Sequence, residues 1–272
     1  AENNRITKLV QTFKDKGAWG IAVSLFQTDL VFEEMEYVEA MVDGLYVVSL
    51  QTWGLNFLAN QNVTALMLRY LDLPSIKHSR SCVFKTIKML HGLMVVDYEN
   101  TIREFNAVKG LDVLTGTMLK YPDEKEAYPD EWAGLLKLLN LTSLDDDTAY
   151  STVRVILNIL ALDDITLTSA VDCLSCLTQL LKFETLEPVF EELKEANFLC
   201  TITKLMPRFR DFASFVEVTF TVLSAVLEAV AGTVELFGGT ENFCTSATAL
   251  LRRHVGNEAI ALLGSTVFNY LS

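Results

Sequence analysis

Two ten-residue stretches, NFLCTITKLM at 197–206 and NFCTSATALL at 242–251, align without a gap at an offset of 45 residues. Self-similarity at a fixed period of this length is typical of proteins built from repeated helical units. The Gly110 corner lies 87 residues before Asn197, which is close to two such periods. The sequence therefore predicts a chain assembled from units of about 45 residues.

A second internal match extends the pattern toward the N-terminus. LNFLA at 55–59 recurs as LNILA at 157–161, an offset of 102 residues. Two periods of about 43 residues and an insertion of about 16 residues account for that offset. Residues 121–130 hold two prolines and four acidic residues, a composition typical of a solvated loop. We therefore expect a surface insertion near 121–130.

Composition favours helices and a large buried interior. Half of the 272 residues are hydrophobic and 21% are charged, which excludes disorder. The 13 Gly and 5 Pro leave little material for the many turns of an all-β fold. Helical periodicity begins at once, with Ile6, Leu9, Val10 and Phe13 on one face of the first helix. We predict an all-α fold that forms a single repeat domain over residues 1–272.

The net charge of -13 bears on the class of partner. Nucleic-acid binding depends on clustered Lys and Arg, so we expect no nucleic-acid partner. A protein partner with a basic or extended segment fits the charge better. The uncharged stretch 44–68 is long enough to cross a bilayer, but its five amide side chains favour a buried helix, so no membrane span is expected.

The cysteines indicate the compartment. Five cysteines, an odd number without framework spacing, predict reduced thiols in the cytoplasm or another reducing intracellular compartment. Cys173 and Cys176 form a Cys-x-x-Cys pair, which suits redox chemistry or a metal in some folds. Within an apolar helical pattern, packing in the core is the competing interpretation.

Motifs for catalysis and cofactor binding are missing from the sequence. It contains no GxxxxGK, GxGxxG or GxSxG motif, and its three histidines are isolated from other candidate ligands. We therefore expect a non-enzymatic protein without a cofactor or a metal site.

The segment 89–119 resembles the junction between two armadillo repeats: a long helix, an Asn, a short helix, a Gly corner at Lys109-Gly110 and another helix. The segment 53–59 (WGLNFLA) looks like the third helix of an armadillo repeat, which lines the concave groove of the family. The resemblance covers most of the chain. It is to the armadillo and HEAT superfamily as a whole and not to a specific protein. It implies a right-handed α-solenoid of about five or six degenerate repeats.

The same resemblance implies a protein-binding groove. In the importin-alpha branch, a Trp and an Asn four residues later clamp an extended peptide. Trp53 matches the Trp, but Phe57 replaces the Asn, so the ladder that reads nuclear signals is absent. Trp53, Asn56 and Asn60 share one helix face, and Asn158 repeats Asn56. These four residues are candidate groove residues, and a packed Trp with capping amides is the alternative.

The last helix differs from the first. Residues 258–271 carry a single charge and spread apolar residues around the helix, including Leu263 and Phe268. A solenoid end needs a polar outer face to stay soluble, so we expect Leu263 and Phe268 to meet a partner or a second copy of the chain.

These expectations combine into one function and one alternative. The first is a protein-binding scaffold or adaptor, including a fixed subunit of a larger assembly, that binds its partner in a concave groove. The alternative is a chaperone cofactor that resembles the armadillo-type nucleotide-exchange factors.

Overall fold

A computed structural model of the chain describes residues 2–28, 35–73, 80–120, 129–139, 141, 144–182, 187–229 and 240–271. Those residues form sixteen helices and no strand, so the prediction of an all-α fold is confirmed. Most of the predicted insertion, residues 121–128, lies outside the described residues.

The chain divides into two compact units, Ala1–Lys120 and Tyr121–Ser272. The boundary coincides with the start of the predicted insertion at 121–130. A single repeat domain over residues 1–272 stays a prediction.

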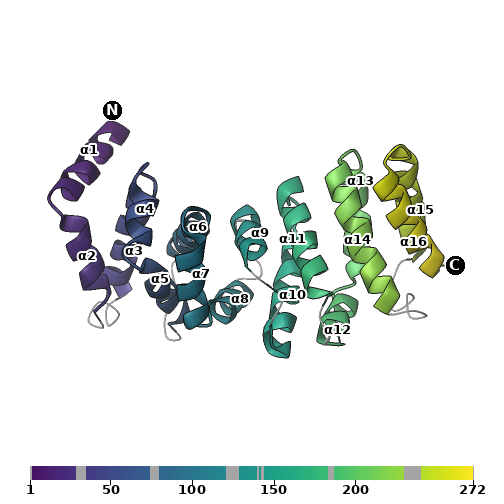
Figure 1. Cartoon of the computed structure of the whole chain (residues 1–272), viewed down its shortest axis with the longest axis horizontal. Coiled ribbons are helices and arrows are strands. Elements are labelled where there is room, and N and C mark those ends of the chain that lie inside the picture. The colour runs from purple at the N-terminus through teal and green to yellow at the C-terminus, as the bar shows by residue number, and fades with distance from the viewer. Residues whose placement is uncertain are drawn as a thin grey trace. The chain divides into compact units, whose positions relative to one another are not determined.

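Unit 1 contains eight helices among its described residues (Figure 1): α1 (Glu2–Asp15), α2 (Ala18–Phe26), α3 (Met35–Ser49), α4 (Gly54–Ala59), α5 (Val63–Asp72), α6 (Arg80–Val96), α7 (Tyr98–Ala107) and α8 (Gly110–Lys120). Helices α3 and α4 pack against α6, while α5 packs against α7 and α8. The core of unit 1 contains large side chains that are fully buried, among them Phe26, Tyr70 and Phe105.

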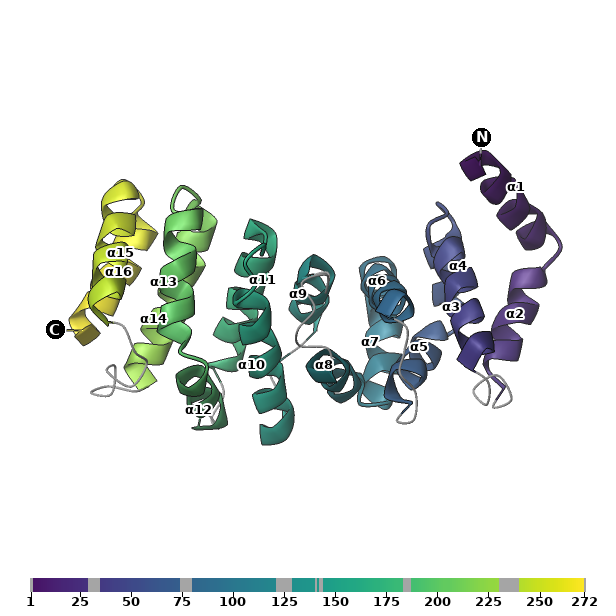
Figure 2. The ribbon, with the colours of Figure 1, turned by 180° about the vertical axis from the view of Figure 1, so that it is seen from behind.

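Unit 2 also contains eight helices among its described residues: α9 (Pro129–Leu138), α10 (Asp146–Leu160), α11 (Leu167–Leu180), α12 (Glu187–Glu195), α13 (Phe198–Phe209), α14 (Ala213–Ala229), α15 (Thr240–Arg253) and α16 (Glu258–Leu271). One row runs from α9 through α11 and α14 to α16, each helix packed on the next (Figure 2). In the other layer α10 packs against α12, and α13 packs against α15. Phe198, Phe215, Phe220 and Phe243 are fully buried between the layers.

Left-handed backbone corners recur at nearly constant spacing. Gly17, Asn62, Lys109 and Asn197 have φ values of 68°, 53°, 52° and 50°, and each stands directly before a helix, namely α2, α5, α8 and α13. The successive separations are 45, 47 and 88 residues. The left-handed region is costly for most L-residues but open to Gly and Asn, which explains three of the four residues. The spacing agrees with the offset of 45 residues between 197–206 and 242–251.

The segment 53–59, for which a third helix of an armadillo repeat is expected, contains the short helix α4. Helix α3 continues through Gly44 and ends at Ser49, and a turn separates it from the six-residue α4. A Cβ on Gly54 would lie 1.7 Å from the Val48 carbonyl oxygen, so only a glycine allows this close return of the chain. Helix α4 precedes the corner at Asn62 as the short α7 precedes the corner at Lys109. The segment therefore takes the place of a short helix before a corner.

The match between 55–59 and 157–161 also fails as a structural correspondence. Residues 55–59 belong to the short α4, whereas 157–160 form the last turn of the fifteen-residue α10. The 102-residue offset therefore does not relate equivalent positions.

Polar side chains cap several helices where the sequence places Asp or Thr. Asp97 accepts a hydrogen bond from the backbone N–H of Asn100, and Asp145 accepts one from that of Thr148. Thr166 performs the same function for Ser169 at the start of α11. These contacts satisfy amide groups that have no partner within the helix.

The apolar stretch 44–68 is divided among α3, α4 and α5. Among the described residues, no helix has both the length and the apolar character that a bilayer crossing requires.

Candidate functional site

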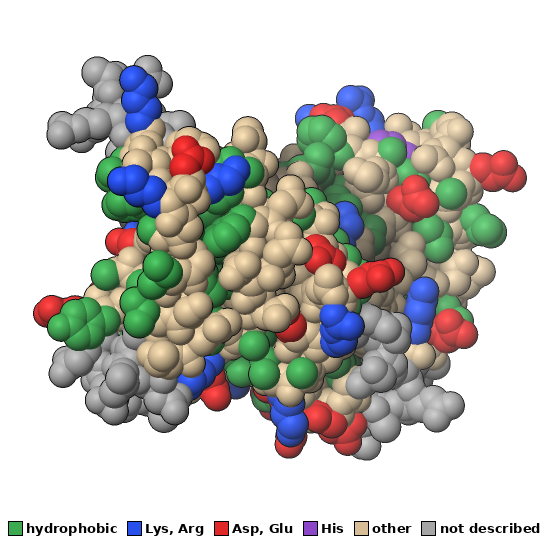
Figure 3. All heavy atoms as spheres, turned by 60° about the vertical axis from the view of Figure 1, so that its left-hand side comes forward, with side chains coloured by type: hydrophobic (Ala, Val, Ile, Leu, Met, Phe, Trp, Pro, Cys, Tyr) green, Lys and Arg blue, Asp and Glu red, His purple; other side chains and the backbone are tan. Residues whose placement is uncertain are grey.

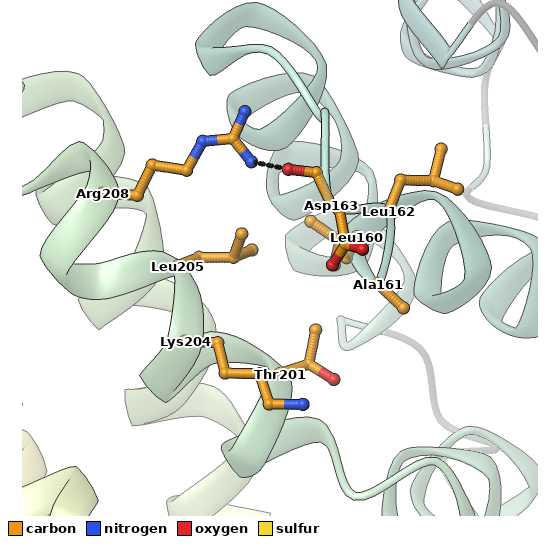
Figure 4. Close-up of a pocket in the computed structure, with 8 residues that line it drawn as sticks. All are labelled: Leu160, Ala161, Leu162, Asp163, Thr201, Lys204, Leu205 and Arg208. Carbon is orange, nitrogen blue, oxygen red and sulfur yellow. Dashed lines mark hydrogen bonds between the residues drawn. The ribbon is translucent and has the colours of Figure 1, made fainter. Parts of the chain in front are cut away.

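A cleft of about 230 Å³ lies in unit 2 between the end of α10 and the outer side of α13 (Figure 4). Helix α13 begins at the Asn197 corner and packs against α10. Eight residues line the cleft: Leu160, Ala161, Leu162, Asp163, Thr201, Lys204, Leu205 and Arg208.

Arg208 holds the chain in place beyond α10. Its Nη1 donates a hydrogen bond of 2.7 Å to the Asp163 carbonyl oxygen, and its Nη2 donates to the Ile165 carbonyl oxygen. Asp163 and Ile165 belong to the turn between α10 and α11, so these hydrogen bonds satisfy backbone carbonyl groups that lie outside both helices. Arg208 therefore positions one wall of the cleft while its guanidinium remains partly exposed to solvent.

The cleft combines an apolar floor with a charged rim. Leu160 and Leu205 are buried, while Asp163 and Lys204 are exposed on opposite walls. Within the described residues, neither Lys204 nor Arg208 has a carboxylate oxygen within 4.0 Å. Such a site can take an apolar side chain on its floor and hydrogen-bond or pair with polar groups along the rim.

Asn158 lies near the C-terminal end of α10 and is exposed. It stands three residues before Ala161, which lines the cleft, but it is not itself one of the lining residues. Arg154 lies one turn earlier on the same face of α10 and is also exposed. A part for Asn158 in a groove stays a prediction.

The buried carboxylate of Glu192 holds Arg154 of α10 in place. Glu192 on α12 is 5% exposed, and its Oε1 lies 3.8 Å from Nε of Arg154. A hydrogen bond to Glu192 raises the pKa of the Tyr150 hydroxyl, which places Tyr150 beside the same carboxylate. These contacts join α10 to α12 and hold the Arg154 side of α10 in position.

The other three predicted groove residues lie in unit 1. Trp53 is half-buried, with its ring 5.8 Å from that of Phe57 and with Nζ of Lys14 4.3 Å from its centroid. Asn56 and Asn60 are exposed, and Asn60 Nδ2 donates to the Asn56 carbonyl oxygen at 2.8 Å. The contacts of Trp53 and Asn60 are those of the packing and capping alternative. Their part in a groove stays a prediction.

The predicted terminal interface is half-buried. On α16, Ile260 and Val267 are buried, and Leu263 and Phe268 are in an intermediate position. The large apolar side chains that α16 leaves exposed are Leu262 and Tyr270. A partner that covers Leu263 and Phe268 stays a prediction.

Sequence reasoning missed Lys204 and Arg208. Their spacing of four residues places both on one face of a helix, a signal that is present in the repeated segment 197–206 and its continuation. The sequence cannot show that residues 160–163 form the opposite wall of the cleft. That wall depends on a contact between Arg208 and the carbonyl group of Asp163, which lies 45 residues earlier. The contact spans one repeat period and needs the tertiary fold.

Cys173 and Cys176 lie on α11, and both side chains are buried in the core of unit 2. Both are buried and free, and burial raises the pKa of each thiol, that of Cys176 to about 12. A protonated, buried thiol is a poor nucleophile. The geometry supports packing for this pair. Among the described residues, no three or more His, Cys, Asp or Glu side chains are grouped as a metal site would need.

We expect Cys173 and Cys176 to react with thiol reagents more slowly than Cys200. At pH 8, a maleimide should modify the exposed Cys200 while Cys173 and Cys176 react only after denaturation. Mass spectrometry of peptides from native and urea-treated protein measures the difference. Equal labelling of Cys176 and Cys200 in the native protein would contradict the buried placement.

Comparison of the chain with protein-family models, curated proteins and solved structures returns no match.

Proposed function

We propose that the chain is a non-enzymatic protein-binding scaffold or adaptor, built as a right-handed solenoid of armadillo-like repeats, whose partner-binding groove includes the α10–α13 cleft. The observation that carries the proposal is the combination of a buried apolar floor with Lys204 and Arg208, two cations without a carboxylate partner among the described residues. The 45-residue spacing of the helix corners supports the repeat architecture.

The cleft favours an extended segment over a helix as its ligand. Asn158 offers an exposed amide, which can donate to and accept from a peptide backbone. The floor at Leu160 and Leu205 suits one aliphatic side chain, and a neighbouring carboxylate would pair with Lys204. The proposed ligand is therefore a short extended peptide with an aliphatic residue beside an acidic one. This proposal keeps the extended segment and replaces the basic charge that the net charge of -13 predicts.

Selection from a random peptide library tests the proposal. Peptides enriched on the full chain are synthesised, and their affinity is measured by fluorescence polarisation. We expect Lys204→Glu and Asn158→Ala to weaken binding by about tenfold and threefold, because each removes one rim contact of a typical strength. Both side chains are exposed, so the fold should be preserved.

Lys182→Glu is the matched control. It makes the same charge change at an exposed Lys of unit 2, just beyond α11 and away from the lining residues of the cleft. The proposal fails if no peptide is enriched, or if Lys182→Glu weakens binding as much as Lys204→Glu. Faster nucleotide release from a chaperone ATPase would instead support the exchange-factor alternative, which no observation on the described residues specifically favours.

A further inference from the structure

Helices α1 and α2 leave large apolar side chains in solvent. Leu9, Phe13, Ile21 and Leu25 are 54%, 40%, 64% and 54% exposed. They form two pairs, one on each helix, with the spacing of four residues that places both members on one face. Among the α1 side chains that the structure describes, Val10 is the buried one. The apolar face of α1 at Leu9 and Phe13 is therefore exposed.

Contacts of Trp19 hold the two helices that carry these side chains in place. The Trp19 indole N–H donates a hydrogen bond of 3.1 Å to the Val10 carbonyl oxygen, and its ring lies edge-on to Phe13 at 5.8 Å. A Cβ on Gly44 would lie 3.6 Å from the Trp19 ring, so Trp19 also packs against α3. Through Trp19, α1 is joined to α2 and α3, and an apolar surface on such a frame can bind without a large ordering cost.

The charge around these side chains is opposite to that of the chain. Residues 8–28 contain three Lys and one Asp, whereas the whole chain carries a net charge of -13. Lys8, Lys14 and Lys16 are all exposed. Figure 3 brings this part of unit 1 forward and shows hydrophobic side chains together with basic ones. An apolar surface flanked by lysines attracts a ligand that is apolar on one side and negatively charged beside it.

We infer that the surface formed by Leu9, Phe13, Ile21 and Leu25, with the three lysines around it, binds an acidic amphipathic helix of a partner protein. A helix presents apolar residues at intervals of three and four, which fits the two pairs on α1 and α2. A symmetric dimer through the same surface would bring the three lysines of one copy against those of the other, and this repulsion disfavours a second copy as the occupant. The surface belongs to unit 1 and is separate from the α10–α13 cleft.

Two synthetic helical peptides of about 18 residues test this surface directly, both with the same leucine stripe and flanked by Glu in one and by Lys in the other. Their binding to the full chain is measured by fluorescence polarisation at low and high salt. We expect the Glu peptide to bind at least about tenfold more tightly than the Lys peptide, with a preference that shrinks as salt rises. Ile21→Ser should weaken binding of the Glu peptide, and Lys16→Glu should reduce the preference.

Leu262→Ser and Lys182→Glu are matched controls, since each makes the same change at an exposed residue of unit 2. The inference is overturned if neither peptide binds, if both bind equally, or if the controls act like Ile21→Ser. Dimerisation that Ile21→Ser abolishes, measured by sedimentation, would assign the surface to a second copy. Binding to phosphatidylserine vesicles in preference to the Glu peptide would assign it to a membrane. Because these variants leave the α10–α13 cleft intact, their failure is distinguishable from failure of the proposed groove.

Discussion

Phe198→Ala and Phe243→Ala should each lower the free energy of unfolding of unit 2 by about 3–5 kcal/mol, the usual cost of removing a fully buried ring. Both rings are 0% exposed, and both stand second in the segments that repeat at an offset of 45 residues. Each substitution removes apolar contacts and leaves a cavity that its neighbours fill only in part. Equal positions in a repeat should therefore give losses of similar size.

Urea unfolding followed by circular dichroism measures these losses, and the repeat itself supplies the controls. Cys200 and Thr245 stand two residues after the two phenylalanines, and both are exposed. Cys200→Ala and Thr245→Ala should change the free energy of unfolding by no more than about 0.5 kcal/mol. A large loss at Phe198 with a small one at Phe243 would show that the two segments do not occupy equivalent places.

Gly54→Ala should destabilise unit 1 by about 2–3 kcal/mol or more, because the added methyl group has no space. Its Cβ would lie 1.7 Å from the Val48 carbonyl oxygen and 2.6 Å from the carbonyl carbon. These are backbone atoms of α3, which cannot rotate aside as a side chain can. The turn between α3 and α4 would have to open, and the packing of α4 on α6 would change with it.

Gly116→Ala is the control for this substitution. Gly116 lies within α8, and a Cβ there would meet no other atom within 4 Å. Alanine should therefore raise the free energy of unfolding by about 0.5–1 kcal/mol through helix propensity alone. Thermal unfolding of both variants gives the comparison. A Gly54→Ala protein that melts with the wild type would contradict the close contact with Val48.

Much of the helical pattern could be predicted because it depends on local chemistry. The corner at Lys109 and Gly110 shows in the sequence, and the structure places a left-handed residue there. The division between α3 and α4 could not be predicted. Gly44 and Gly54 look alike as helix breakers, but Gly44 lies inside α3 against Trp19, whereas Gly54 contacts the Val48 backbone. Only tertiary contacts separate the two.

The candidate site was harder to predict than the fold. The sequence match between Asn158 and Asn56 does not carry over to the structure, because Asn158 lies at the end of a long helix and Asn56 in a short one. An exposed apolar surface was expected on α16, yet α1 and α2 expose more large apolar side chains than α16 does among the described residues. A helical pattern shows which face is apolar. It does not show whether a neighbouring helix covers that face.

The left-handed corners have a consequence for how such a chain evolves. Each corner turns the backbone into the next helix with one residue, and the intervals of 45 and 47 residues show that helix and loop lengths can vary while the turn is kept. Between Lys109 and Asn197, α10 begins at a capping Asp145 in place of a left-handed residue. We therefore expect that duplication or loss of a whole segment of about 45 residues would preserve the turns on either side of it.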